Sequence, residues 1–183
     1  MNDIILFKII IFGDESLGKA TFFKMAVPDL YSLGLTGSKM IFGWEIYSKL
    51  VSVEGQKTKL QLWDLSGDPR FIFFHSRYIR GAQGGLILFD VTKRSSIARI
   101  DDWLNLIKNG LTNGVKIPIL VVGIVPNEKS ERLISAEEGL KIVKSKNLNG
   151  YIEYDLKTGK NIEKVFEDLV RMILINAGLL NTP

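Results

Sequence analysis

Blocks of apolar residues alternate along this chain with amphipathic blocks, and the alternation predicts strands followed by helices. Residues 4–12 are almost wholly apolar, which is typical of a strand buried on both faces. A helix is predicted from about residue 18 to residue 26, and Pro28 then ends it. The turn sequence Glu54-Gly55-Gln56 separates two strand-like segments and predicts a β-hairpin. The two strands of the hairpin span residues 44–53 and 57–63. Two further strand-like segments span residues 85–89 and 117–123.

Three further segments have the 3.6-residue spacing of amphipathic helices. The first spans about residues 96–108, and the second begins at a capping box formed by Ser135 and Glu138. The third starts at about residue 162 and stops before Gly178. A fifth helix is expected after Gly67, and the alternation as a whole fits six strands and five helices, five of the strands being the segments given above. Strands and helices in alternation predict an α/β fold, a parallel sheet covered by helices.

The composition is that of one folded domain. With 183 residues and 46% hydrophobic residues, we expect a single domain over residues 1–183 with a full core. The net charge is +4, and the densest basic stretch, residues 141–146, lies in an amphipathic helix whose polar face would be solvated. A nucleic-acid-binding protein would usually show a clustered basic stripe. We therefore expect no nucleic-acid partner.

Cysteine is absent, which excludes disulfides, cysteine-ligated metals and thiol catalysis. It also excludes prenylation and palmitoylation, and Asn2 makes myristoylation unexpected, so no direct lipid anchor is predicted. Apolar runs are far shorter than the roughly 18 residues that a membrane span needs. We expect a cytoplasmic protein.

The chemistry of the chain is concentrated in a phosphate-binding loop. Gly13 is followed after four residues by Gly18 and Lys19, directly after the first strand and before the first helix. Glycines let successive N–H groups point at one anion, and the helix N-terminus and the lysine add positive charge. The motif continues with a serine or threonine that binds magnesium, but this chain has Ala20.

A second signal lies at the end of an apolar strand, where Asp64 is followed by Gly67. Beside a phosphate loop, the Asp64 carboxylate could hold a magnesium-bound water and the Gly67 N–H could meet a terminal phosphate. The alternative is a turn at the end of a strand in which Asp64 acts as a local cap.

Taken together, these motifs resemble the Ras superfamily of small GTPases, and the Rab branch most closely. The stretches that carry the resemblance are residues 13–19, 59–67, 78–85, 89–92 and 157–162. The resemblance implies a P-loop NTPase fold, a three-layer α/β/α sandwich with a six-stranded, mostly parallel sheet and five helices. It also implies GTP or GDP with Mg²⁺, and two switch loops contacted by effector or regulator proteins.

The phosphate-binding residues carried over from the family are Gly13, Asp14, Glu15, Ser16, Leu17, Gly18, Lys19, Ala20, Thr21 and Gly67. Glu15 stands where the family has a small residue, and its carboxylate would either repel the terminal phosphate or turn to solvent. Thr21 is a poor substitute for the hydroxyl missing at Ala20, because successive helical residues face about 100° apart.

The switch positions depart further from the family pattern. An ungapped alignment places Ile41 where a threonine should bind magnesium. Thr36 could serve instead if the loop is rearranged, or it is an ordinary loop residue. Asp68 replaces the glutamine that orients the attacking water, so it is a doubtful catalytic residue and hydrolysis should be impaired. His75 is expected at the surface rather than as a base.

Aromatic residues near both switches have two interpretations. Phe42, Trp44 and Tyr47 would either flank an effector surface or pack within the hairpin. The cluster at residues 71–74, like Trp44, could be a partner surface or part of the core.

The base-binding motif is the weakest match. The family sequence Asn-Lys-x-Asp is replaced by residues 124–127, with Asn127 at the aspartate position. Its carbonyl could accept one hydrogen bond from guanine but not two. The family's second base-binding segment, Ser-Ala-Lys, is replaced by Asp155-Leu156-Lys157. The Lys157 stem could still cover the base, and the Leu156 N–H could still meet a purine oxygen.

Two functions therefore remain open. The first is a Rab-like switch that binds GTP or GDP and hydrolyses GTP slowly. The second is a pseudo-GTPase that keeps the fold as a protein-interaction module and binds nucleotide weakly or not at all.

Overall fold

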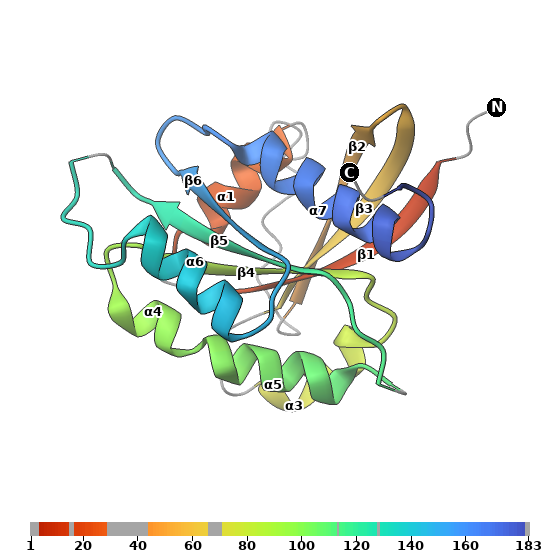
Figure 1. Cartoon of the computed structure of the whole chain (residues 1–183), viewed down its shortest axis with the longest axis horizontal. Helices are drawn as coiled ribbons and strands as arrows, with labels where there is room; N and C mark the ends of the chain where they lie inside the picture. Colours follow the sequence, from red (N-terminus) through yellow and green to blue (C-terminus); the bar gives the residue numbers. More distant parts are fainter. Residues whose placement is uncertain are drawn as a thin grey trace.

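The computed structural model describes residues 4–14, 17–28, 44–65, 71–112, 114–127 and 129–181. These residues form a six-stranded sheet in the order β2-β3-β1-β4-β5-β6, with one antiparallel pair, β2 and β3 (Figure 1). The strands are β1 Ile5–Phe12, β2 Trp44–Val53, β3 Gln56–Leu65, β4 Gly84–Asp90, β5 Ile119–Val125 and β6 Gly150–Asp155. The predicted sheet is confirmed.

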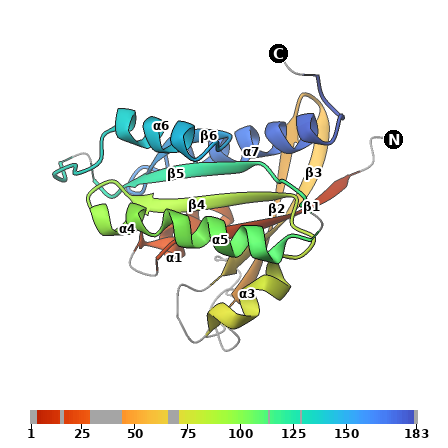
Figure 2. The same ribbon diagram turned by 60° about the horizontal axis from the view of Figure 1, so that its bottom comes forward.

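Helices cover both faces of the sheet, as predicted. They are α1 Lys19–Ala26, α3 Ile72–Ile79, α4 Arg94–Ala98, α5 Ile100–Gly110, α6 Ala136–Ser145 and α7 Ile162–Asn176. In Figure 1, α1 and α7 lie on one face and the other helices on the opposite face. Figure 2 shows that the start of β1 and the end of α7 lie at the same end of the molecule. None of the helices in these described segments has the length and apolarity needed to cross a membrane.

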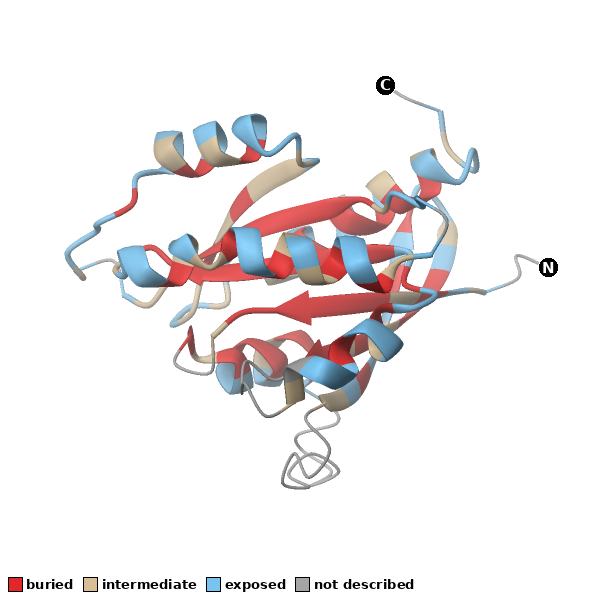
Figure 3. Cartoon of the chain, turned by 90° about the horizontal axis from the view of Figure 1, so that it is seen from below, coloured by how far each residue is buried: buried red, intermediate tan, exposed pale blue. Residues whose placement is uncertain are grey.

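Each face of the sheet has its own hydrophobic core, and the central strands are buried on both sides (Figure 3). On the α1 and α7 side, Phe22 packs edge-on against Tyr154 with ring centroids 5.5 Å apart. On the other side, Phe12 stacks on Trp103 at 5.3 Å. Phe12 is the last residue of β1, so this second core reaches the edge of the sheet where the phosphate loop begins.

Local signals in the sequence form as predicted. Glu54 and Gly55 make the hairpin turn with positive φ angles of 50° and 81°. Ser135 and Glu138 form both hydrogen bonds of the capping box at the start of α6. At the end of α7, the Leu179 N–H donates to the Leu174 carbonyl at 2.8 Å, which is a Schellman cap around Gly178.

One predicted helix is divided. The periodic segment at residues 96–108 forms α4 and α5, separated at Arg99, where φ is −83° and ψ is 0°. No glycine or proline marks the break, so the apolar period continues across it and the sequence gives no sign of it. The interruption turns Arg99 toward the phosphate loop, as described below.

The prediction that His75 lies at the surface is wrong. His75 is fully buried in α3, and its ring faces Phe12 edge-on at 6.1 Å. Ile79, one turn later on α3, is buried as well, so this side of the helix faces the sheet. A lone histidine in a predicted helix cannot be placed from composition alone, because the apolar face of a short helix is defined by few residues.

The aromatic alternatives are resolved for the described residues. Tyr47 packs within the core, stacked on Phe23 at 4.3 Å, whereas Trp44 lies half-buried on the opposite face beside Trp63. Phe73 and Phe74 are surface residues, 89% and 46% exposed. Phe42 and Ile41 lie outside the described residues.

Candidate functional site

The phosphate loop connects β1 to α1 at the carboxyl edge of the sheet. The Leu17 N–H donates to the Asp14 carbonyl at 3.1 Å, and Gly18 has the left-handed φ of 73° just before α1. A Cβ added at Gly13 would lie 2.8 Å from Leu17 Cδ1 and 3.1 Å from the Leu88 carbonyl oxygen. Both glycines are therefore required by the local geometry. Glu15 and Ser16 lie outside the described residues.

Lys19, the first residue of α1, is buried and faces β3. Its Nζ donates to Asp64 Oδ1 at 2.9 Å and to the Leu65 carbonyl at 3.2 Å. Parallel pairing of Ile11 with Asp64 places the end of β3 beside the loop. The two residues singled out by the sequence are thus brought together, and each compensates the buried charge of the other.

Asp14 is bound by a residue that sequence analysis missed. Arg99 Nη1 donates to Asp14 Oδ1 at 2.6 Å, and the Arg99 guanidinium lies 4.4 Å from the ring centroid of Trp103. Arg99 Nε also lies 3.9 Å from Asp102 Oδ2. The guanidinium is therefore held by a carboxylate and an aromatic face, and it fixes the start of the phosphate loop to the α4–α5 junction.

Replacing Arg99 with glutamine should lower the free energy of unfolding by about 1 kcal/mol, because the ion pair and the cation–π contact are both partly exposed. Urea denaturation measures this change. Arg94→Gln is the matched control, since Arg94 pairs with Glu138 at 3.1 Å on an exposed surface. Equal effects of the two substitutions would show that Arg99 has no special role in holding the loop.

The second base-binding segment is bent by Asp155. Asp155 Oδ1 accepts hydrogen bonds from the N–H groups of Lys157 at 2.9 Å and Thr158 at 2.7 Å. The Thr158 hydrogen bond is the main cause that holds the pKa of Asp155 below its usual value. Lys157 is exposed, as a side chain that covers a bound base would be.

The predicted purine contact of the Leu156 N–H is not available in this structure. This N–H donates to the Val125 carbonyl at 2.9 Å, because the pairing of β6 with β5 continues one residue beyond Asp155. The Leu156 side chain turns toward the phosphate loop, where a Cβ on Gly18 would lie 3.2 Å from Leu156 Cδ2. The Leu156 side chain therefore packs against the phosphate loop at Gly18.

Asn127 is bound within its own loop. Its Oδ1 accepts the Lys129 N–H at 3.1 Å, and its backbone carbonyl accepts the Ser130 N–H at 2.9 Å. One of the two acceptor sites of the side-chain oxygen is therefore engaged by the loop itself. Guanine presents two N–H donors to this position, and the remaining acceptor site can satisfy only one of them.

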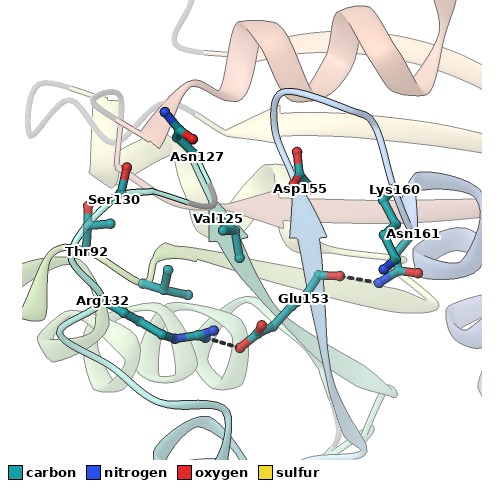
Figure 4. A pocket seen from close by; sticks show the side chains of 10 residues that line it. Thr92, Val125, Asn127, Ser130, Arg132, Glu153, Asp155, Lys160 and Asn161 are labelled. Carbon is teal, nitrogen blue, oxygen red and sulfur yellow. Dashed lines mark hydrogen bonds and ion pairs between the residues drawn. The ribbon is translucent and has the colours of Figure 1, made fainter.

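A polar cavity of about 300 Å³ lies at the carboxyl ends of β4, β5 and β6 (Figure 4). Both Asn127 and Asp155 line it. An ion pair between Arg132 and Glu153 closes one side, and Asn161 Nδ2 donates to the Glu153 carbonyl at 2.8 Å. The other residues lining the cavity are Val91, Thr92, Val125, Ser130 and Lys160.

Metal ligands are scarce in the parts of the chain that the structure describes. No group of three or more histidine, aspartate or glutamate side chains there could hold a metal ion. Asp64 is placed beside the phosphate loop, whereas Ala20 and Thr21 are exposed. Thr36, Gly67 and Asp68 lie outside the described residues, so their predicted roles stay predictions.

Comparison with known proteins agrees with this architecture. The Ras family model matches residues 8–175. The chain is 31% identical over 181 residues to Ras-related protein Rab-18-B of Danio rerio, covering 98% of this chain and 85% of that protein. It is 32% identical over 179 residues to Ras-related protein RABA5b of Arabidopsis thaliana, covering 97% and 80%. It is 29% identical over 173 residues to Ras-related protein Rab-13 of Canis lupus familiaris, covering 94% and 82%. The chain therefore belongs to the Ras family, within its Rab-like branch.

Proposed function

We propose that this protein binds GTP or GDP as a molecular switch and hydrolyses GTP slowly. The observation that carries the proposal is the buried Lys19, held beside the phosphate loop with its Nζ 2.9 Å from Asp64. A lysine at this position supplies a full positive charge to the phosphates, and the loop amides supply N–H donors. Effector or regulator proteins would contact the switch loops, and the cytoplasm is the proposed location.

Phosphate binding requires an exchange of partners. Lys19 Nζ now binds Asp64 and the Leu65 carbonyl, so a bound phosphate must compete with both. The affinity is therefore the difference between two sets of hydrogen bonds to the same ammonium group. Because the Asp64 carboxylate is almost fully buried, it needs a replacement partner when Lys19 turns to phosphate.

Mg²⁺ is the ion that the family uses with its nucleotide, and the described residues fit it only in part. Asp64 could hold a magnesium-bound water and would thereby gain the replacement partner. Ala20 lacks the hydroxyl that would bind the metal directly, and Thr21 is exposed at the start of α1. Thr36 remains the proposed substitute from the first switch. We expect magnesium to strengthen nucleotide binding less than a complete ligand set would.

Slow hydrolysis is proposed because Asp68 stands at the glutamine position. Asp68→Gln should raise single-turnover GTP hydrolysis about tenfold or more, because glutamine can orient the attacking water by donating and accepting hydrogen bonds. Phosphate release measured at saturating GTP tests this. Glu137→Gln, an exposed substitution on α6, is the control. If turnover is unchanged in Asp68→Gln, the slow hydrolysis would instead be caused by the missing metal ligands or by Glu15.

A protein-interaction module without nucleotide is the second candidate. Two observations favour it: the Lys19–Asp64 pair satisfies the site internally, and Leu156 lies against Gly18. Titration calorimetry with GDP, GTP and ATP, each with and without Mg²⁺, separates the candidates. Saturable binding of GDP and GTP supports the switch. Absence of heat with all three nucleotides would contradict it and favour the interaction module.

A further inference from the structure

A second cavity, of about 630 Å³, lies between the end of α5 and the start of β5, and we call it the α5 cavity. Its lining comes from the last turns of α5, from residues 114–119, from the loop at residues 147–149 that leads into β6, and from Asn176 of α7. In Figure 1, α5 and α7 end on the right, whereas β5 and β6 end on the left, where the polar cavity of Figure 4 lies. The α5 cavity is therefore a separate site, at the opposite end of the strands from the phosphate loop.

The lining of the α5 cavity is mainly aliphatic. Ile107 and Ile119 are buried, whereas Val115 is 53% exposed, so the cavity reaches from the core to the solvent. Within the described residues no aromatic side chain lines it, so a planar ligand would find no ring on which to stack. A flexible hydrocarbon chain is the apolar group that suits such a lining. The half-buried aliphatic residues of the lining, which also pack against the core, are Leu104, Leu111, Ile117 and Leu148.

Polar contacts hold the walls of the α5 cavity in place. Asn149 Oδ1 accepts the Ile119 N–H at 2.9 Å, and the Asn149 N–H donates to the Ile119 carbonyl at 3.2 Å, which ties the loop before β6 to the start of β5. Lys146 Nζ donates to Asp101 Oδ2 at 2.7 Å, which ties the end of α6 to α5. A ligand that enters a preformed cavity has little conformational entropy of the protein to overcome.

The charged side chains that line the α5 cavity are both cationic in the part of the chain that the structure describes. Lys108 lies in the last turn of α5, and Lys116 lies just before β5. Both are exposed, and no carboxylate of the described segments pairs with either, whereas the neighbouring Lys146 pairs with Asp101. The lining thus joins aliphatic walls to two ammonium groups that are available to an anion. Side-chain amides that can donate further hydrogen bonds come from Asn147, Asn149 and Asn176.

We propose that the α5 cavity binds an aliphatic carboxylate, a small molecule with one hydrocarbon chain of medium length and an anionic head. The chain would lie against the aliphatic walls, and the carboxylate would lie at the opening, where Lys108 and Lys116 can bind it. The volume lies within the range of about 300–1,000 Å³ that is usual for small-ligand sites. Because the α5 cavity is separate from the phosphate loop, this binding does not depend on the proposed nucleotide site.

Titration of the isotope-labelled full chain with decanoate, followed by amide chemical shifts in NMR, tests the proposal. The shifts should saturate, should be confined to residues 104–119 and 147–149 and their neighbours, and should weaken as NaCl is raised. Hexanoate, which has a shorter chain, should bind about tenfold or more weakly, because fewer methylene groups are buried. Decyltrimethylammonium has a chain of the same length with a cationic head and should not bind. Titrations with and without added GDP keep this test separate from nucleotide binding.

The double variant Lys108→Glu with Lys116→Glu should weaken decanoate binding about fivefold or more, because two attractions to the carboxylate become two repulsions. Both residues are exposed, so the fold should be retained, which thermal unfolding checks. The matched control is Lys57→Glu with Lys59→Glu, which changes the net charge equally at exposed positions of β3, three strands away from β5 in the sheet. The comparison of the three ligands on the unsubstituted chain depends on neither variant.

Four outcomes would overturn the proposal. Decanoate causes no saturable shifts around the α5 cavity, decyltrimethylammonium binds as well as decanoate, or the β3 control weakens binding as much as the test variant. The fourth is equal affinity for hexanoate and decanoate, because the hydrocarbon chain would then lie outside the cavity. None of these outcomes bears on the nucleotide site, since the ligands contain neither a base nor a phosphate.

Discussion

Replacing Lys19 with alanine is expected to have two separable effects. Nucleotide retention should be lost, because the loop loses the buried ammonium group that would bind the phosphates. The free energy of unfolding should also fall by about 3–5 kcal/mol, because the buried Asp64 carboxylate would lose the cation that pairs with it. Binding of a fluorescent GDP analogue and urea denaturation measure the two effects.

A compensating substitution distinguishes these effects. Lys19→Met with Asp64→Leu removes both charges and should recover most of the lost stability, since a buried ion pair can be replaced by apolar groups of similar volume. Nucleotide binding should not return. If the double variant retained GDP as well as the unsubstituted protein does, Lys19 would have no part in phosphate binding and the proposed switch would lose its main support.

Asn127→Asp should give the largest gain in affinity. An aspartate here accepts two hydrogen bonds from guanine with an ionised group, and each such bond is worth about 1.5–3 kcal/mol, so GDP affinity should rise about tenfold or more. ATP affinity should not rise, because adenine lacks the donors that guanine places there. Competition between GDP and ATP for the fluorescent analogue measures the change.

Leu156→Ala is the companion substitution at the other side of the base position. It removes the side chain that lies against Gly18, and it should add to the gain from Asn127→Asp. Leu140→Ala, at an exposed leucine of α6, should leave both affinities unchanged. Equal gains for GDP and ATP in Asn127→Asp would contradict the assignment of Asn127 to the guanine edge.

The phosphate loop and the sheet could be predicted because their signals are local. The spacing of Gly13, Gly18 and Lys19 reflects backbone geometry within one turn, and apolar runs of five to nine residues identify buried strands. The position of Asp64 followed from a strand end beside that loop. The strand order β2-β3-β1-β4-β5-β6 was not predicted, because neither periodicity nor composition determines it.

Contacts between distant segments could not be predicted. Arg99 and Asp14 are 85 residues apart, and no motif relates an arginine in an amphipathic helix to a phosphate loop. The burial of His75 likewise depends on packing against Phe12 of β1, and the break between α4 and α5 lies at Arg99, whose guanidinium meets Asp14. The Leu156 N–H was assigned to a purine by analogy with the family. In the structure it donates to the Val125 carbonyl, because strand pairing continues one residue further.

Nucleotide content of the purified protein tests the central proposal most directly. The protein is purified gently with magnesium, denatured, and the released nucleotide is identified by chromatography. We predict GDP or GTP close to one per chain, retained by the loop around Lys19. Empty protein that also fails to take up added GTP or ATP would contradict the switch, and the fold would then serve as an interaction module.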